Sequence, residues 1–200
     1  MKKLAQKISE LENTCRAIVA EKRMKNARQV FAQIRAYRKK DRPYKTKYRE
    51  RTQRDCDKRY INSLQEFIDA SNAPTVDYIS FAIEWKKSRT WGWNPRVYSR
   101  INGFSGESYA SGCGYDKLSS AVSSSLHSPA WRRFAIENMN KLKKCYGFNM
   151  YDGMPGFCFG GCGMSTLESA LKELDWKRHD WSCRSYDKQG DTIAGNYSKK

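Results

Sequence analysis

The sequence predicts an α+β fold: a basic N-terminal arm of two or three helices, then a mostly antiparallel sheet with helices on one face. Charge is the first observation, because residues 1–60 hold 20 Lys and Arg against 7 Asp and Glu, whereas residues 61–200 hold 18 against 14. All six Trp lie at or after position 85. Apolar residues show helical spacing before residue 70 and alternate with polar ones from 79 to 85. These shifts predict a basic helical region, 1–73, and an α+β domain, 74–200.

The helical spacing is clearest at the N-terminus. Leu4, Ile8, Leu11, Cys15 and Ile18 recur at intervals of three and four, which predicts an amphipathic helix over about 3–20. The pattern resumes at 27–37 and stops before the proline at 43, either as one long helix or as two that meet near residue 22. A third helix is expected at about 46–70. The amphipathic first helix also predicts a possible homodimer formed by pairing with a second copy.

The second region alternates strands and helices. Strands are expected at 79–85, 97–101 and 104–110. Helices follow at about 116–126, from Ser128-Pro129 onward as N-cap and first helical residue, and at about 165–174. A short strand near 157–159 and two more, 176–186 and 192–197, complete the order β-β-β-α-α-β-α-β-β. This order favours an antiparallel sheet in an α+β domain.

A short internal repeat precedes two of these helices. Gly112-Cys113-Gly114 leads to Asp116 as an expected N-cap, and Gly161-Cys162-Gly163 leads to Ser165. Two glycines and a helix N-terminus can admit an anion, so the possible anion site comprises Gly112, Gly114, Gly161 and Gly163. The alternative, which we favour, is that the two units only pack against each other through their small residues.

Basic residues dominate the chain from 22 to 59, with Tyr37, Tyr44 and Tyr48 between them. Lys and Arg neutralise phosphates, and tyrosines stack on exposed bases. A solvated helix usually alternates its charges, so the excess of one sign favours a nucleic acid, or a complex that carries one, as partner. The predicted binding residues are Lys22, Arg23, Lys25, Arg28, Arg35, Arg38, Lys39, Lys40, Arg42, Lys45, Lys47, Arg49, Arg51 and Arg54.

A second candidate surface lies at the expected turn between the first two strands. Its basic residues and tryptophans suit stacking or a protein contact, and the alternative is an aromatic cluster folded onto the sheet. Its residues are Lys86, Lys87, Arg89, Trp91 and Trp93.

The cysteines and histidines predict no metal site. Cys158, Cys162, His179 and Cys183 form two pairs of potential zinc ligands, but their spacing fits the common zinc motifs poorly. We expect buried thiols and a surface histidine there, and no cofactor. Cys113 and Cys162 precede helix N-termini, where a thiol can become nucleophilic, which leaves a cysteine-dependent or nucleotide-handling enzyme as the alternative function. The chain offers no paired carboxylates and no serine elbow, so we expect a protein that is not an enzyme.

The segment Trp91-Gly92-Trp93-Asn94-Pro95, followed by Ser111-Gly112-Cys113-Gly114-Tyr115-Asp116-Lys117, carries a resemblance. Together with Ala121 and Leu126 it is similar to small uncharacterised proteins encoded by phages and mobile elements of Gram-positive gut bacteria. The similarity covers roughly residues 76–190 and implies no established activity or catalytic residues. It implies an accessory protein made during infection, a setting in which anti-CRISPR inhibitors of host nucleases are common. The N-terminal region lies outside it, so its role rests on charge alone.

No apolar run approaches the roughly 20 residues that span a bilayer. The start, Met1-Lys2-Lys3, continues into a charged amphipathic pattern, which is unlike a signal peptide. We therefore expect no membrane partner and a cytoplasmic location in the host bacterial cell. The expected function is that of a non-enzymatic accessory protein that binds nucleic acid or a host defence nuclease complex.

Overall fold

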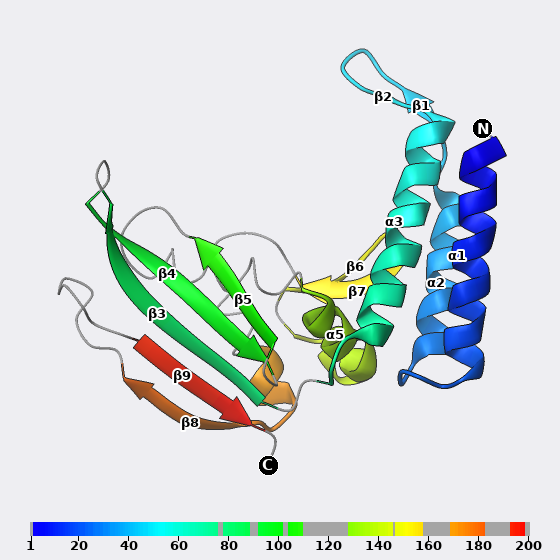
Figure 1. Ribbon diagram of the computed structural model, residues 1–200. Coiled ribbons are helices and arrows are strands. Elements are labelled where there is room, and N and C mark those ends of the chain that lie inside the picture. The colour runs from blue at the N-terminus through cyan, green and yellow to red at the C-terminus, as the bar shows by residue number, and fades with distance from the viewer. Residues whose placement is uncertain are drawn as a thin grey trace.

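The computed structural model has the α+β fold that the sequence predicts (Figure 1). It describes residues 2–75, 78–88, 92–101, 104–109, 128–145, 147–157, 169–182 and 193–198, and the strands between 78 and 109 and after 176 are described by their backbone. The helices are α1 (Lys2–Ala20), α2 (Ala27–Lys40), α3 (Gln53–Asn72) and α5 (Pro129–Leu142). Two small hairpins are formed by β1 (Tyr44–Lys45) with β2 (Glu50–Arg51) and by β6 (Phe148–Tyr151) with β7 (Met154–Phe157).

The first three helices pack side by side, and their directions determine which of their ends lie together. α1 and α3 start at the same end of this group of helices and run in the same direction, whereas α2 runs in the opposite direction (Figure 1). The amphipathic patterns at 3–20 and 27–37 are confirmed as two helices, because the chain turns at 21–26, where Lys22 and Asn26 have positive φ. The α2–α3 connection therefore lies beside the start of α1.

The third helix begins at Gln53, so the predicted start at about 46 was wrong. Residues 44–51 instead form the β1–β2 hairpin, in which Tyr44 pairs with Arg51. Thr52 ends this hairpin and caps α3: its hydroxyl accepts from the Asp55 N–H at 3.2 Å, while the Asp55 carboxylate accepts from the Thr52 N–H at 2.9 Å. This reciprocal capping box satisfies two backbone donors that a helix start otherwise leaves open.

A single core joins the N-terminal helices to later elements. Ile18, Ile34 and Phe67 from α1, α2 and α3 are almost completely buried, and they share this core with Ile136 of α5 and Met154 of β7. The helix predicted from Ser128-Pro129 is confirmed as α5, although the Ser128 side chain makes no capping bond. Because the core includes residues from both sides of position 73, packing does not stop at the predicted domain boundary.

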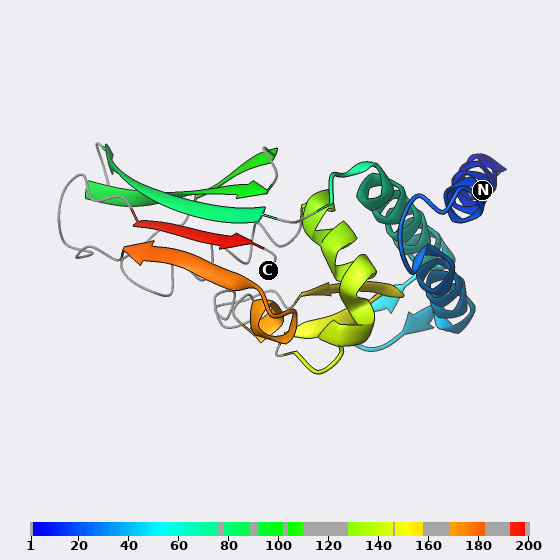
Figure 2. The same cartoon turned by 90° about the horizontal axis from the view of Figure 1, so that it is seen from below.

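The larger sheet has five strands in the order β5-β4-β3-β9-β8, and every neighbouring pair is antiparallel. The strands predicted at 79–85, 97–101 and 104–110 are confirmed as β3 (Tyr78–Ser88), β4 (Gly92–Ile101) and β5 (Phe104–Tyr109). Those predicted at 176–186 and 192–197 correspond to β8 (Lys177–Ser182) and β9 (Ile193–Ser198). α5 lies between this sheet and the three N-terminal helices (Figure 2).

Residues 148–157 form the β6–β7 hairpin, which was not predicted from the sequence. Of the strand predicted near 157–159, Phe157 is the last residue of β7, and residues 158–159 lie outside the described residues. The two strands of the hairpin are joined by Asp152 and Gly153, which both have positive φ, as a tight two-residue turn requires. The hairpin packs against α2 and α5. Of the two helices predicted after the glycine-cysteine-glycine repeats, residues 169–173 are helical, and the segment 116–126 lies outside the described residues.

Arg133 of α5 ties three backbone segments together. Its guanidinium donates to the carbonyls of Ser71 and Ala73, which end α3, and to the carbonyl of Arg23 in the α1–α2 connection at 3.2 Å. Its Nε lies 2.9 Å from Glu137, one turn further along α5. The side chain therefore satisfies carbonyls that the helix geometry of α3 leaves without a donor.

Replacing Arg133 by alanine is expected to lower the free energy of unfolding by about 2 kcal/mol, because partly buried carbonyls lose a charged donor. Arg133→Lys should recover part of the loss. Arg16→Ala is the matched control, since Arg16 pairs with Glu12 on an exposed helix surface and should cost less than about 0.5 kcal/mol. Urea unfolding followed by circular dichroism measures all three, and equal losses for Arg133→Ala and Arg16→Ala would contradict the assigned role.

Candidate nucleic-acid interface

The starts of α1 and α3, the end of α2 and the projecting β1–β2 hairpin lie at one end of the helices (Figure 1), and all four elements carry basic residues there. We call this surface the basic end and define it as Lys3 and Lys7 of α1 together with residues 35–59. Residues 35–59 contain 12 Lys and Arg against 4 Asp and Glu. Since α1 and α3 start at the same end, their N-terminal charges join those of the last turns of α2.

Two of the four acidic residues form close ion pairs inside the basic end. Asp41, just after α2, is nearly buried and accepts a hydrogen bond from Arg51 of β2 at 2.7 Å. Asp57 of α3 lies 2.5 Å from Arg38 of α2. The Arg38 guanidinium also lies 5.1 Å from the centroid of the Tyr60 ring, within range of a cation–π contact. These pairs hold the hairpin and α3 against α2.

The other two acidic residues also have partners. Glu50 lies 3.7 Å from Lys45 on the neighbouring strand of the hairpin. Asp55 accepts hydrogen bonds from the backbone and hydroxyl of Thr52, and these bonds lower the pKa of the Asp55 carboxyl. Each carboxylate of residues 35–59 is thus already engaged within the chain.

Most of the basic side chains, by contrast, remain available. Eight of them are exposed and have no carboxylate of a described residue within ion-pair distance. They are Arg35, Lys39, Lys40, Arg42, Lys47, Arg49, Arg54 and Lys58. The basic end therefore presents a surface of uncompensated positive charge.

The three tyrosines of this region have different environments. Tyr37 accepts a hydrogen bond from Arg59 at 2.6 Å, and burial is the main cause of its raised pKa. Tyr44 is 36% exposed, and the Arg51 guanidinium lies 4.9 Å from its ring centroid. Tyr48 is 89% exposed at the hairpin tip. Tyr48 is therefore by far the most exposed of the three, and Tyr44 is only partly covered.

The tip that carries Tyr48 is an ordered turn. The Thr46 N–H donates to the Arg49 carbonyl at 2.7 Å, and the Arg49 N–H donates to the Thr46 hydroxyl oxygen at 3.0 Å. The Thr46 hydroxyl in turn donates to the Arg49 carbonyl at 3.0 Å. These bonds fix the positions of Lys47 and Tyr48 between them.

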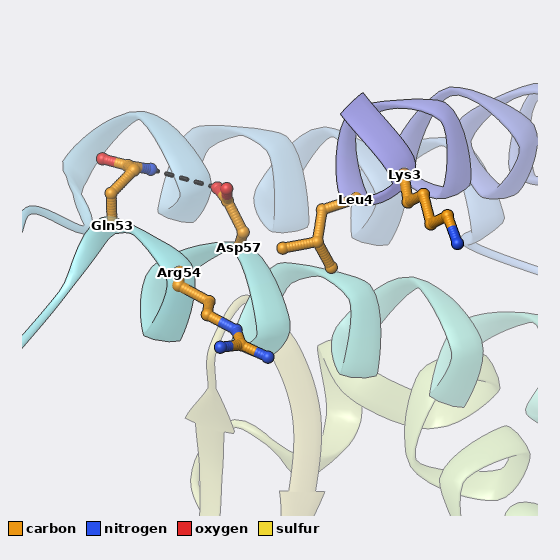
Figure 3. A pocket seen from close by; sticks show the side chains of 5 residues that line it. All are labelled: Lys3, Leu4, Gln53, Arg54 and Asp57. Carbon is orange, nitrogen blue, oxygen red and sulfur yellow. Dashed lines mark hydrogen bonds between the residues drawn. The ribbon is translucent and has the colours of Figure 1, made fainter. Parts of the chain in front are cut away.

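A hollow of about 380 Å³ lies between the first turns of α1 and α3 (Figure 3). It is lined by Lys3 and Leu4 from α1 and by Gln53, Arg54 and Asp57 from α3. The Asp57 carboxylate accepts a hydrogen bond from the Gln53 amide at 3.0 Å and also pairs with Arg38, which does not line the hollow. The hollow therefore interrupts the basic end without adding free negative charge.

A second hollow, of about 470 Å³, has mixed charge and lies further along α3. Arg59 pairs there with Asp152, and Arg132 lies 3.1 Å from Glu66. Burial raises the pKa of the Glu66 carboxyl, and Arg132 partly offsets this effect. The lining of this second hollow comprises Arg59, Asn62, Ser63, Glu66, Arg132, Tyr151 and Asp152. Its charges largely cancel, so it does not extend the surface for a polyanion.

The structure divides the predicted binding residues between two places. Those from 35 to 54 gather at the basic end, whereas those at 22–28 lie around the α1–α2 connection, at the opposite end of the helices (Figure 1). The predicted set omits four basic residues of the basic end. They are Lys3, Lys7, Lys58 and Arg59. Lys58 and Arg59 could have been predicted from the sequence, because they continue the same basic run.

The second predicted surface lies elsewhere. Lys86 and Lys87 of β3 pair with Asn94 and Trp93 of β4, at the end of the sheet that points away from the helices in Figures 1 and 2. Several other predicted residues lie outside the described residues. They are Arg89, Trp91, Gly112, Cys113, Gly114, Cys158, Gly161, Cys162, Gly163 and Cys183, while His179 lies on β8.

The cysteines that the structure describes are structural. Cys15, Cys56 and Cys145 are buried, and burial raises the pKa of each thiol, to about 12 for Cys15. A raised pKa disfavours the thiolate that nucleophilic catalysis requires. Among the described residues, no group of three or more His, Cys, Asp or Glu side chains is arranged to hold a metal ion.

The apolar stripe of α1, which suggested a homodimer, packs inside the chain. Cys15 and Ile18 are buried, and Ile8 and Leu11 are partly buried against the core shared with α2 and α3. The stripe therefore has intramolecular partners, and the homodimer stays a prediction.

Comparisons of the chain with protein-family profiles, curated protein sequences and solved structures find no significant match. In the part of the chain that is described, no helix combines the length and the apolar character needed to cross a bilayer.

Proposed function

We propose that this protein binds nucleic acid, or a complex that displays nucleic acid, through its basic end. One observation carries the proposal: eight exposed cations lack a carboxylate partner among the described residues, while all four acidic residues of 35–59 are engaged within the chain. An ordinary solvated surface pairs or alternates its charges. Uncompensated cations gathered from four elements favour a polyanionic partner instead.

Phosphate contact accounts for the affinity that such a surface provides. Each Lys or Arg that neutralises a phosphate releases a condensed counterion, and this gain does not depend on base sequence. The exposed cations of the basic end carry their charge on long side chains from α2, α3 and the hairpin, which suits contact with a flexible backbone. We therefore expect binding with little sequence specificity.

The test is a charge reversal that preserves the fold. Arg54 lies in the first turn of α3, where the helix dipole favours Glu, and Lys58 lies one turn further along. Both side chains are exposed, and the new like-charged pair should cost only about 0.5 kcal/mol, so Arg54→Glu/Lys58→Glu should still fold. Its affinity for an oligonucleotide should fall about tenfold to a hundredfold, because two phosphate contacts are replaced by repulsion. The matched control is Lys25→Glu/Arg28→Glu, which makes the same change in net charge near the start of α2, at the opposite end of the helices.

Fluorescence anisotropy with a labelled oligonucleotide measures both variants. Weaker binding by the α3 variant alone supports the basic end. Equal losses in both variants would show that net charge, and not this surface, determines binding. No binding by the wild-type protein at low salt would overturn the proposal and favour a protein partner.

The anti-CRISPR role implied by the phage and mobile-element resemblance stays a proposal about the biological setting. A basic end that binds nucleic acid is compatible with inhibition of a host nuclease, either by occupying its nucleic-acid channel or by binding its guide or target. The alternative of an enzyme that uses the paired glycine-cysteine-glycine turns also stays a prediction, since those turns lie outside the described residues.

A further inference from the structure

We infer that Tyr48 stacks on an unpaired base, so that the preferred ligand of the basic end contains a single-stranded segment. This inference rests on the proposed function and names the class of nucleic acid. Its basis is the position of one exposed aromatic ring among cations at the tip of the β1–β2 hairpin.

Exposure separates Tyr48 from the other tyrosines of the basic end. Arg59 contacts the hydroxyl of Tyr37, and Arg51 lies over the ring of Tyr44, so both rings are used within the fold. Tyr48 is 89% exposed. A large aromatic side chain held in water at this level has no packing role in the chain.

The hairpin fixes the backbone that carries this ring. The hydrogen bonds between Thr46 and Arg49 order the backbone of the turn, so little backbone freedom is lost when a ligand binds. Lys47 and Arg49, the residues before and after Tyr48 in the sequence, are exposed and can contact phosphates. The Lys47 ammonium lies 5.5 Å from the Tyr48 ring centroid, which favours a base on the opposite ring face.

An unpaired base fits this arrangement better than a duplex. Bases in a duplex are stacked on one another, and only unstacked bases present a free face to an aromatic side chain. The hairpin has two paired residues on each strand, so it offers little side-chain surface for reading base edges in a groove. Stacking tolerates any base, which agrees with a surface that binds mainly phosphates.

The experiment compares Tyr48→Ala and Tyr48→Phe in the full chain. The probes are a short single-stranded DNA and a single-stranded RNA, each with one 2-aminopurine, and the corresponding duplexes. Tyr48→Ala should bind both single strands about tenfold to a hundredfold more weakly and should lose the fluorescence quenching that stacking causes. Tyr48→Phe should retain both, because it keeps the ring. Met150→Ala is the control for removal of an exposed large side chain, since Met150 is 38% exposed on β6.

The outcomes separate this inference from the proposed function. If Tyr48→Ala binds single strands as the wild-type protein does, while Arg54→Glu/Lys58→Glu loses affinity, the basic end stands and the stacking inference is overturned. Equal losses on single strands and duplexes would also overturn it. If the wild-type protein binds neither form, both proposals fail, and Tyr48 is then a candidate contact for a protein.

Discussion

Gly153→Ala is expected to lower the free energy of unfolding by about 3–5 kcal/mol, since two separate penalties act at this position. Gly153 has a φ of +86°, in the region that residues with a side chain rarely adopt. A Cβ there would lie 2.6 Å from the Ile34 Cα and 2.8 Å from the Gln33 carbonyl oxygen. Both contacts are with the backbone of α2, so the movement of a side chain cannot relieve the clash.

Urea unfolding of the variant measures this effect. The expected loss is a large part of the roughly 5–15 kcal/mol that stabilises a typical domain, so partial unfolding in water is also expected. Met150→Ala is a control within the same hairpin, because Met150 is 38% exposed and the loss of its side chain should cost no more than about 1 kcal/mol. A Gly153→Ala variant as stable as Met150→Ala would show that the hairpin does not pack on α2 as described.

The affinity for a nucleic-acid duplex is expected to fall about a thousandfold between roughly 50 and 200 mM salt, and the affinity for a single strand somewhat less, because each phosphate contact on a single strand releases less counterion. The basic end has eight exposed cations without a carboxylate partner among the described residues. If about six of them contact duplex phosphates, the logarithm of the affinity should fall with the logarithm of salt concentration with a slope near −5. Few other interactions depend so steeply on salt.

A salt series by fluorescence anisotropy gives this slope directly. Arg54→Glu/Lys58→Glu should make it less steep by about 2, one for each lost phosphate contact. Lys25→Glu/Arg28→Glu should leave it unchanged. A slope near zero in the wild-type protein would mean that binding, if any, does not depend on phosphates and would contradict the proposed interface.

The elements that the sequence predicts well are those with strong periodicity. α1 and α2 follow apolar spacings of three and four, and β3 follows strict alternation, because one face of each is expected to be buried. The start of α3 was missed, although Thr52 and Asp55 have the spacing of a capping box. The long basic run around them carries no periodic signal, so the hairpin before the cap was read as helix.

The β6–β7 hairpin was missed for a different reason. The dipeptide Asp152-Gly153, between Phe148–Tyr151 and Met154–Phe157, is a recognised hairpin signal. Each strand has only four residues, and β7 contains Pro155 and Gly156, which weakens the alternation that identifies strands. Here the turn residues Asp152 and Gly153 predict the hairpin better than the apolar pattern of its strands does.

The sequence predicts which basic residues belong to the candidate site, but it does not predict how the fold arranges them. The sequence identifies the basic run, but it does not show that Lys25 and Lys39 lie at opposite ends of the helices. Nor does it show which cations are neutralised, because the Arg38–Asp57 and Arg51–Asp41 pairs join different elements. The sequence likewise does not show that arginines contact Tyr37 and Tyr44, whereas Tyr48 is 89% exposed.

The core that α3 shares with α5 and β7 has a practical consequence for dissecting this protein. A fragment ending at residue 73 would lack Ile136 and Met154, so the side of the helices that these residues cover would be open to water. It would also lack Arg133, whose guanidinium closes the last turn of α3. The N-terminal helices therefore share their core with later elements, and a fragment designed to keep them folded should also include α5 and the β6–β7 hairpin.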